Sequence, residues 1–254
     1  LESLPFDDKI GVLKQPKMRA RILSEAIDPD PTIVLGRLVS EFDHMFLLGD
    51  PPDYEQPFDQ SIRALAQRAS VSPEELVYDL MLERDGHTML YVTLCNYEYG
   101  SLESSLAMMR HPGAVLGLGD GGAHCGTICD GSFPTFMLSY WVRDRTRGER
   151  LSLSETVRML SRDAARAVGL EDRGVIAPGY KADLNVIDLD QLRLYAPEVA
   201  HDLPTGGRRL VQRADGYCAT IVSGRIVHRN GSHTGELPGR LVRGPQAVPP
   251  NMHQ

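Results

Sequence analysis

The chain has 254 residues, of which 42% are hydrophobic and 24% charged, the composition of an ordinary soluble globular protein. Its net charge of −7 argues against a broad nucleic-acid surface or an anionic-membrane surface, and no apolar run approaches the about 20 residues of a transmembrane helix. From the charge and the apolar runs we expect no nucleic-acid or membrane partner. Four cysteines do not indicate a disulfide framework in a chain of this length, so we expect a cytoplasmic protein.

The first seventy-five residues contain one clear helix signal. Prolines interrupt the beginning of the chain, where residues 17–26 are compatible with a short helix and residues 37–48 with a helix or a strand. Ser72, Pro73 and Glu75 then combine an N-cap serine, a first-turn proline and a capping-box glutamate. This combination predicts a helix that begins at about residue 73.

The residue pattern in the middle of the chain predicts a strand, a helix and a second strand, in that order. Residues 89–94 are rich in strand formers, Ser101 is a candidate cap for a helix that ends at residues 111–113, and residues 115–118 are again apolar. This order predicts that the two strands pair in parallel through a right-handed crossover.

From Pro134 onward, the chain changes from helical to β character. Pro134 can open an apolar helix, and a second capping box, Ser152 with Glu155, begins another helix, which Gly169 terminates. The apolar period of the second helix predicts four inward-facing side chains: Val157, Leu160, Ala164 and Val168. A strand over 183–189 and a hairpin over 217–229, turning at Ser223-Gly224, follow.

The most informative stretch is residues 115–124, where a short apolar run ends in Asp120 among glycines. A buried strand can deliver a carboxylate to a polar site in this way, and the glycines allow a ligand to approach the backbone closely. The alternative is that Asp120 opens a tight turn, since Asp-Gly pairs are common there.

Three blocks in a fixed order resemble the metal-dependent amidohydrolases. Residues 117–123 look like the last barrel strand of these enzymes, and residues 172–184 are similar to the segment that leads from the barrel into a small β-subdomain. Residues 234–240 (Thr-Gly-Glu-Leu-Pro-Gly-Arg) resemble the C-terminal signature of the D-aminoacylase branch, the N-acyl-D-amino-acid deacylases.

The resemblance implies a fold of the α/β class. We expect the last units of a TIM-like (β/α) barrel of the metal-dependent hydrolase type over residues 1–172. A small all-β, sandwich-like subdomain would follow over residues 173–245, and an extended tail over 246–254.

The resemblance also implies hydrolysis of a non-peptide C–N (amide) bond in a small N-acylated substrate, with zinc as cofactor. Asp120 matches the aspartate that acts as general base and can contact the metal. His124, just after the strand, and Asn96 and Tyr97, which follow strand 89–94, are candidates for substrate binding. The alternative for His124 is a turn histidine, and the alternative for Asn96 and Tyr97 is a polar loop.

The chain departs from the family pattern at several positions. It contains no His-x-His pair, the usual source of first-strand metal ligands, so we expect this chain to be the C-terminal portion of a longer enzyme. The chain alone is expected to hold no zinc and to be inactive, whereas the longer enzyme is expected to bind zinc. Gly119 replaces the usual serine before Asp120, and no arginine lies between Asp120 and Arg143 to clamp a substrate carboxylate. Cys125 and Cys129 are expected in a pocket wall or core rather than in a metal site.

A second function, from a different class, remains open. A truncated relative could keep half a barrel and act as a non-catalytic binding or self-associating module. A serine hydrolase is excluded because the sequence has no Gly-x-Ser-x-Gly elbow.

The half-barrel predicts self-association. An open parallel edge exposes unpaired backbone groups and apolar surface, so we expect the isolated chain to form homo-oligomers through this edge. Sedimentation velocity over a range of concentrations should show a dimer or a larger species. A monomer at every concentration would contradict the prediction.

Overall fold

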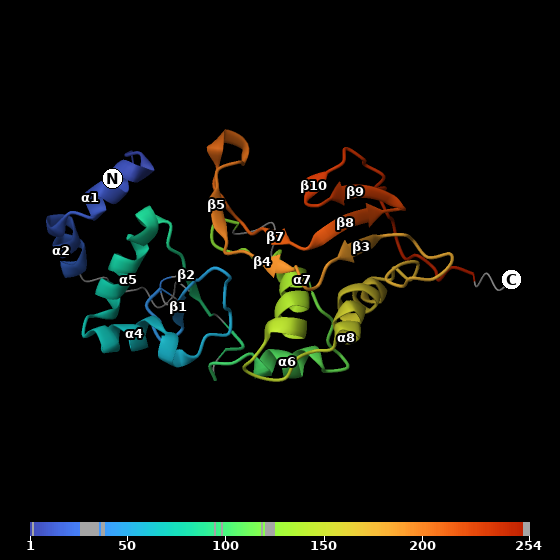
Figure 1. Cartoon of the computed structure of the whole chain (residues 1–254), viewed down its shortest axis with the longest axis horizontal. Helices are drawn as coiled ribbons and strands as arrows, with labels where there is room; N and C mark the ends of the chain where they lie inside the picture. The colour runs from blue at the N-terminus through green and yellow to red at the C-terminus, as the bar shows by residue number, and fades with distance from the viewer. Residues whose placement is uncertain are drawn as a thin grey trace. The chain divides into compact units, whose positions relative to one another are not determined.

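The computed structural model describes residues 1, 3–25, 36, 39–93, 95–97, 99–117, 119 and 125–250 (Figure 1). It divides into two compact units, Leu1–Leu106 and Ala107–Gln254. Asp120 and His124, the two central residues of the sequence prediction, lie outside the described residues. Among the described residues, no helix combines the length and apolar character that crossing a bilayer requires.

The first unit is mainly helical. Its elements, with α6 continuing past its boundary, are α1 (Phe6–Leu13), α2 (Pro16–Ser24), β1 (Met45–Leu47), η1 (Phe58–Gln60), α4 (Ile62–Ala69), α5 (Pro73–Met81), η2 (Glu83–Gly86), β2 (Leu90–Val92) and α6 (Glu103–Met109). The capping box at α5 is confirmed: Ser72 Oγ accepts from Glu75 N, and Ser72 N donates to Glu75 Oε2, both at 3.1 Å. Together these bonds satisfy backbone donors that the first helical turn leaves unpaired.

The predicted parallel pairing of strand 89–94 is wrong. Strand β2 pairs antiparallel with β1, with Phe46 opposite Tyr91. Of the range 37–48, for which the sequence leaves both a helix and a strand open, residues 39–48 are described and contain the short strand β1. Residues 115–117, the expected parallel partner, form no strand, and Val115 is 50% exposed. The antiparallel pair is favoured because Phe46 is fully buried and stacks on Tyr91, with ring centroids 5.3 Å apart.

The second unit begins with two helical stretches that each contain a π-helical segment. These are α7 (Phe133–Phe136) with η3 (Met137–Asp144), and α8 (Leu153–Arg158) with η4 (Met159–Asp163) and α9 (Ala164–Ala167). The helices predicted from Pro134 and Ser152 are therefore present, and Ser152 Oγ accepts the predicted cap bond from Glu155 N at 3.2 Å.

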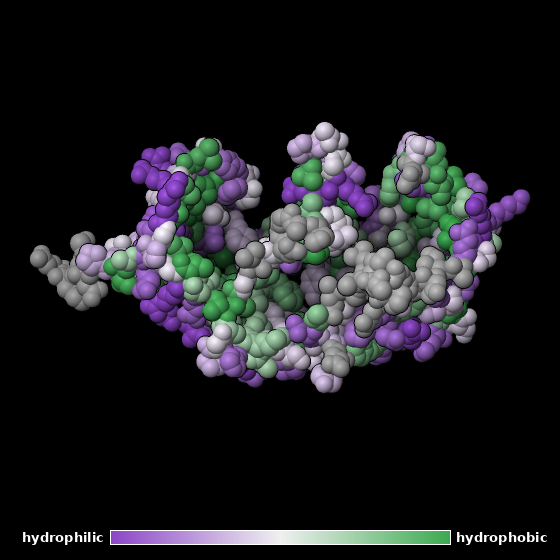
Figure 2. Space-filling model, turned by 180° about the vertical axis from the view of Figure 1, so that it is seen from behind, coloured by the Kyte–Doolittle hydropathy of each residue, from purple (hydrophilic) through white to green (hydrophobic). Residues whose placement is uncertain are grey.

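The predicted inward face of the second helix is wrong at its two ends. Val157 and Val168 are 47% and 68% exposed, whereas Thr156 and Met159 are buried. The π-helical segment has more residues per turn than an α-helix, so a period of 3.6 residues does not hold across it. Hydrophobic residues also show at the surface among hydrophilic ones on the face drawn in Figure 2.

The rest of the second unit is antiparallel β structure. Its strands are β3 (Leu184–Ile187), β4 (Arg193–Leu194), β5 (Glu198–Ala200), β6 (Arg209–Val211), β7 (Ala214–Asp215), β8 (Tyr217–Val222), β9 (Arg225–Arg229) and β10 (Ser232–His233). One sheet has the order β10-β9-β8-β3, and two further pairs are β4-β7 and β5-β6. The predicted hairpin is confirmed: Ser223 and Gly224, with φ of 50° and 78°, form the turn between β8 and β9.

The block at residues 172–184 ties this hairpin to the chain that leads into it. Arg173 lies between two carboxylates, 2.9 Å from Asp172 Oδ1 and 3.4 Å from Asp183 Oδ2. The other Asp183 oxygen accepts from the backbone N–H of Ser223 at 2.8 Å. The hydrogen bond from Arg173 lowers the pKa of Asp172, so this carboxylate stays charged at neutral pH. The described contacts give this signature block a structural role.

The fold class is confirmed at the coarse level, as an α/β chain. All the sheets among the described residues are antiparallel, and they close no barrel. The division at residues 172 and 245 stays a prediction. Near the second of these positions, the backbone of Gln246 pairs with the chain just after α9. Its carbonyl accepts from Glu171 N at 3.0 Å, and its N–H donates to the carbonyl of Gly169 at 2.8 Å.

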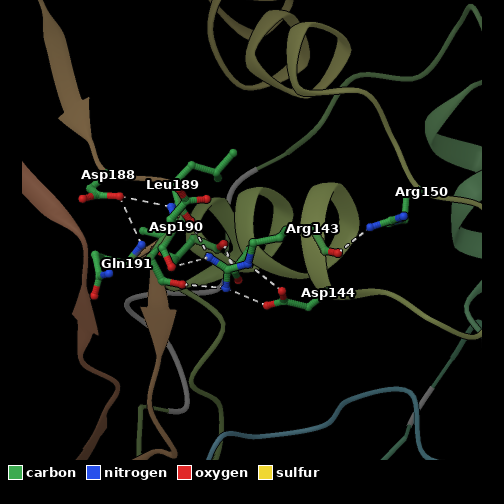
Figure 3. A network of polar contacts seen from close by, with 10 residues as sticks. Arg143, Asp144, Arg150, Asp188, Leu189, Asp190 and Gln191 are labelled. Atoms are coloured by element: carbon green, nitrogen blue, oxygen red, sulfur yellow. Dashed lines mark hydrogen bonds and ion pairs between the residues drawn. The ribbon is translucent and has the colours of Figure 1, made fainter.

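An arginine side chain makes one of the connections between the first helical stretch of the second unit and its β structure. Arg143, in η3, donates to the backbone carbonyls of Leu189 and Leu192 and to both oxygens of Asp144 (Figure 3). The carboxylate of Asp188 accepts from two backbone N–H groups of the same loop, those of Asp190 and Gln191. The guanidinium therefore binds a loop whose shape is already set.

Replacement of Arg143 by lysine should destabilise the second unit. One ammonium group cannot reproduce the planar fork that reaches two carbonyls and a carboxylate, so we expect Arg143→Lys to lower the free energy of unfolding by about 1–3 kcal/mol. Urea unfolding measures the change. Arg166→Lys, at an exposed position of α9, is the matched control and should leave the midpoint unchanged. Equal midpoints for the two variants would contradict the prediction.

Candidate functional site

The described residues on either side of Asp120 define the surroundings of the candidate site. Gly119 precedes Asp120 directly, and Cys125 follows His124 directly. Both belong to the second unit, and each is the described position nearest in sequence to the predicted catalytic aspartate on its own side. The site is therefore built from these two positions outward.

Gly119 lies against the backbone of Asp130. A Cβ atom at position 119 would stand 2.6 Å from the carbonyl oxygen of Asp130 and 2.9 Å from its Oδ1. The first contact is with backbone, which cannot rotate away as a side chain can. This contact gives a physical reason for the departure from the family pattern: a serine at residue 119 does not fit unless the loop at Asp130 moves.

A pocket of about 430 Å³ opens beside this contact, and we call it the ribbon pocket. One wall is the loop of residues 125–132, and the other is formed by the β5–β6 ribbon and its flanks. Its lining residues are Cys125, Ile128, Cys129, Asp130, Gly131, Ser132, Leu203, Arg209, Leu210, Val211 and Gln212. The volume lies within the range of small-molecule sites, about 300–1,000 Å³.

Hydrogen bonds hold the two walls of the ribbon pocket together. Leu210 N donates to the carbonyl of Cys125 at 2.7 Å. Ser132 Oγ donates to Gln212 Oε1, and Gln212 Nε2 donates to the carbonyl of Tyr195 at 2.7 Å. The loop that follows Asp120 is thus joined to the β structure through backbone and side chains.

The guanidinium of Arg209, which lines the ribbon pocket, forms hydrogen bonds with the carboxylate of Asp202. Arg209 Nε and Nη2 each lie 2.7 Å from an oxygen of Asp202, and this pairing raises the pKa of Arg209 and lowers that of Asp202. Burial raises the pKa of the Cys129 thiol, the nearby Asp130 adds to the effect, and Arg209 opposes it. Cys129 is therefore a neutral thiol at neutral pH, which fits a pocket wall rather than a nucleophile.

Asn96 and Tyr97 lie in the first unit. Asn96 is exposed and has a left-handed backbone, with φ of 63°. Tyr97 is 2% exposed, donates its hydroxyl to the carbonyl of Gln56, and packs edge-on against Phe46 and Phe58, with ring centroids 6.1 Å away in each case. These contacts are those of a turn residue and a core residue, and the predicted substrate-binding roles stay predictions.

Sequence reasoning missed the β5–β6 ribbon, which supplies much of the pocket wall. Leu203, Leu210 and Gln212 carry no motif, and residues this far from Asp120 in sequence are joined to its loop only by the folded chain. The available signal was the turn at Pro204-Thr205-Gly206-Gly207, which marks a short ribbon between residues 198 and 211.

The described residues do not make up a metal centre by themselves. Among them, no group of three or more histidine, cysteine, aspartate or glutamate side chains is placed to hold a metal ion. Catalytic zinc requires about three protein ligands, and the sequence has no His-x-His pair. The described residues therefore do not fit a complete zinc site, and no reaction step through a metal is derived from them.

Comparison with known proteins identifies the family. The model of the Amidohydrolase family matches residues 58–228, more than half of the chain and the whole stretch from Gly119 to the ribbon pocket. The chain belongs to the amidohydrolase family, a family of metal-dependent hydrolases. The resemblance that the three sequence blocks indicated is thereby confirmed at the level of the family.

The similar proteins act on different compounds. A 5-methylthioadenosine/S-adenosylhomocysteine deaminase of Desulfitobacterium hafniense is 35% identical over 39% of this chain and 23% of its own length. A dihydroorotase of Methanothermobacter thermautotrophicus is 42% identical over 32% of this chain and 19% of its own length. A solved D-aminoacylase variant with copper chloride has 18% identity and a TM-score of 0.42, over 91% of this chain and 44% of that chain. The chain thus spans less than a quarter of the length of the deaminase and of the dihydroorotase.

A side chain at residue 119 should displace the pocket loop. We expect Gly119→Ala to lower the free energy of unfolding by about 1–3 kcal/mol, because the new methyl group meets the carbonyl of Asp130. Gly117→Ala is the matched control, since no heavy atom lies within 4 Å of a Cβ at residue 117. Thermal unfolding of both variants measures the difference, and the prediction fails if Gly119→Ala is as stable as Gly117→Ala.

Proposed function

We propose that this chain supplies the aspartate-bearing part of a metal-dependent amidohydrolase that cleaves the amide bond of a small N-acylated substrate, as N-acyl-amino-acid deacylases do. The match to the Amidohydrolase family over residues 58–228 carries this proposal, because it includes Asp120 and the ribbon pocket. The final block at residues 234–240 supports the deacylase branch within the family.

In the proposed reaction, Asp120 is the general base. Its carboxylate takes a proton from a water molecule whose oxygen attacks the acyl carbon, and the same proton then passes to the leaving nitrogen. A C–O bond forms and the C–N bond breaks, which yields a carboxylic acid and an amine. His124 would lie beside the substrate, and Asn96 and Tyr97 are retained as weaker candidates for substrate contact.

Zinc is the metal that we expect in the whole enzyme. Such an ion lowers the pKa of water and polarises a carbonyl group. Asp120 is proposed to contact it. The described residues offer no cluster of three ligands, so the other ligands are proposed to come from outside them, and this chain is proposed to be inactive alone.

The same observation supports a second candidate. Without a ligand cluster in the described part of the chain, a non-catalytic relative that binds small molecules or pairs with a second copy also fits. Metal content and turnover distinguish the two candidates, because only the hydrolase needs both.

Asp120→Asn tests the proposed general base. In the whole protein encoded by this gene, we expect zinc by elemental analysis, hydrolysis of simple N-acyl amines, and a fall in kcat of about 10²–10⁴-fold in Asp120→Asn. Asp163→Asn, in the helical segment η4, is the control and should keep full activity. The 254-residue chain alone should contain no stoichiometric zinc. Absence of both zinc and turnover from the whole protein would overturn the proposal and favour the non-catalytic relative.

A further inference from the structure

We infer that the ribbon pocket binds the hydrocarbon chain of the substrate's acyl group, so that the enzyme prefers medium-length aliphatic amides to acetyl amides. This inference rests on the proposed function. It goes further by assigning the acyl subsite to the loop of residues 125–132 and the β5–β6 ribbon.

The aliphatic part of the pocket lining offers a surface for a hydrocarbon ligand. Ile128 from the loop and Leu203, Leu210 and Val211 from the ribbon side contribute aliphatic side chains. Cys125 and Cys129 add two thiols, which behave as small apolar groups when they are neutral. Removal of the apolar surface of these side chains from water stabilises a bound hydrocarbon chain by about 25 cal/mol per Å².

The polar side chains of the pocket are engaged with protein partners. Arg209 forms its two hydrogen bonds with Asp202, and Ser132 donates to Gln212, which in turn donates to the carbonyl of Tyr195. A substrate carboxylate would have to compete with Asp202 for the guanidinium. It would also approach the acidic side chain of Asp130. A neutral hydrocarbon chain avoids both costs.

The position of the pocket fits an acyl chain. Gly119 packs against Asp130, which lines the pocket, and Asp120 is the next residue in the chain. This adjacency in sequence between the proposed base and a residue that packs against the pocket wall is the reason for assigning the pocket to the substituent of the acyl carbon.

Cysteine labelling tests binding without requiring turnover. Cys125 and Cys129 line the pocket, whereas Cys95 and Cys218 are exposed elsewhere and serve as internal controls. The whole protein is treated with N-ethylmaleimide in the presence of N-methylhexanamide or N-methylacetamide, and the labelling rate of each cysteine is measured by mass spectrometry. We expect the hexanamide to slow labelling of Cys125 and Cys129 several-fold, the acetamide to have little effect, and Cys95 and Cys218 to react unchanged.

Two results of this experiment would overturn the inference. Equal labelling rates with both amides would show that the pocket does not bind the hydrocarbon chain. Equal slowing of all four cysteines would show a general effect on the protein rather than occupancy of the pocket.

A pocket-filling substitution tests the consequence for specificity. Leu210→Trp should reduce the ratio of kcat/KM for hexanoyl over acetyl substrates by about tenfold, with acetyl hydrolysis maintained. Val199→Trp is the matched control: Val199 is the cross-strand partner of Leu210 on the same ribbon, is 49% exposed and does not line the pocket. An unchanged ratio in a folded Leu210→Trp protein contradicts the inference.

The two levels of the proposal fail separately. Protection of Cys125 and Cys129 without hydrolysis of any amide would support the subsite and remove the proposed function. Hydrolysis without protection and without chain-length preference would keep the function and remove the subsite.

Discussion

The attachment of Arg143 to the loop of residues 189–192 is the interaction on which the second unit depends. Its guanidinium reaches two backbone carbonyls of that loop while it is held by Asp144, so the helical stretch through η3 and the β structure keep one relative position within the unit. Three hydrogen-bonding directions in one plane are a property of arginine that lysine lacks. The helical stretch also contacts the β structure through Thr135, whose hydroxyl lies 2.8 Å from that of Tyr217.

The ribbon pocket depends on this arrangement because its two walls belong to the two parts that Arg143 connects. The loop of residues 125–132 leads into α7, and the β5–β6 ribbon extends from the β structure. The bond from Leu210 N to the carbonyl of Cys125 joins the walls directly. Local secondary structure therefore positions neither wall alone. The ribbon wall of the pocket is thus distant in sequence from Asp120, whereas the loop wall follows Asp120 closely.

Local signals predicted local structure well. The capping box at Ser72, the N-cap at Ser152 and the turn at Ser223-Gly224 are all confirmed, because each depends on hydrogen bonds or backbone angles within a few residues. Strand pairing was predicted poorly. Strand β2 pairs with β1 because Phe46 is buried against Tyr91, and this tertiary contact cannot be inferred from the order of strands in the sequence. The buried face of α8 and η4 was missed because nothing in the sequence marked the π-helical segment. The candidate site was located by its aspartate, but the opposite wall of the pocket carries no motif.

The close approach of Gly119 to Asp130 links two properties that are usually considered separately. The residue before the proposed base and the loop that bounds the pocket share one contact surface, with no space for even a methyl group between them. Any change that moves the end of the segment before Asp120 must therefore move the pocket wall, and any change that widens the pocket at Asp130 releases the segment. In the proposed function, the alignment of Asp120 and the shape of the acyl subsite therefore depend on the same contact, and a substitution at Gly119 or Asp130 is expected to alter both.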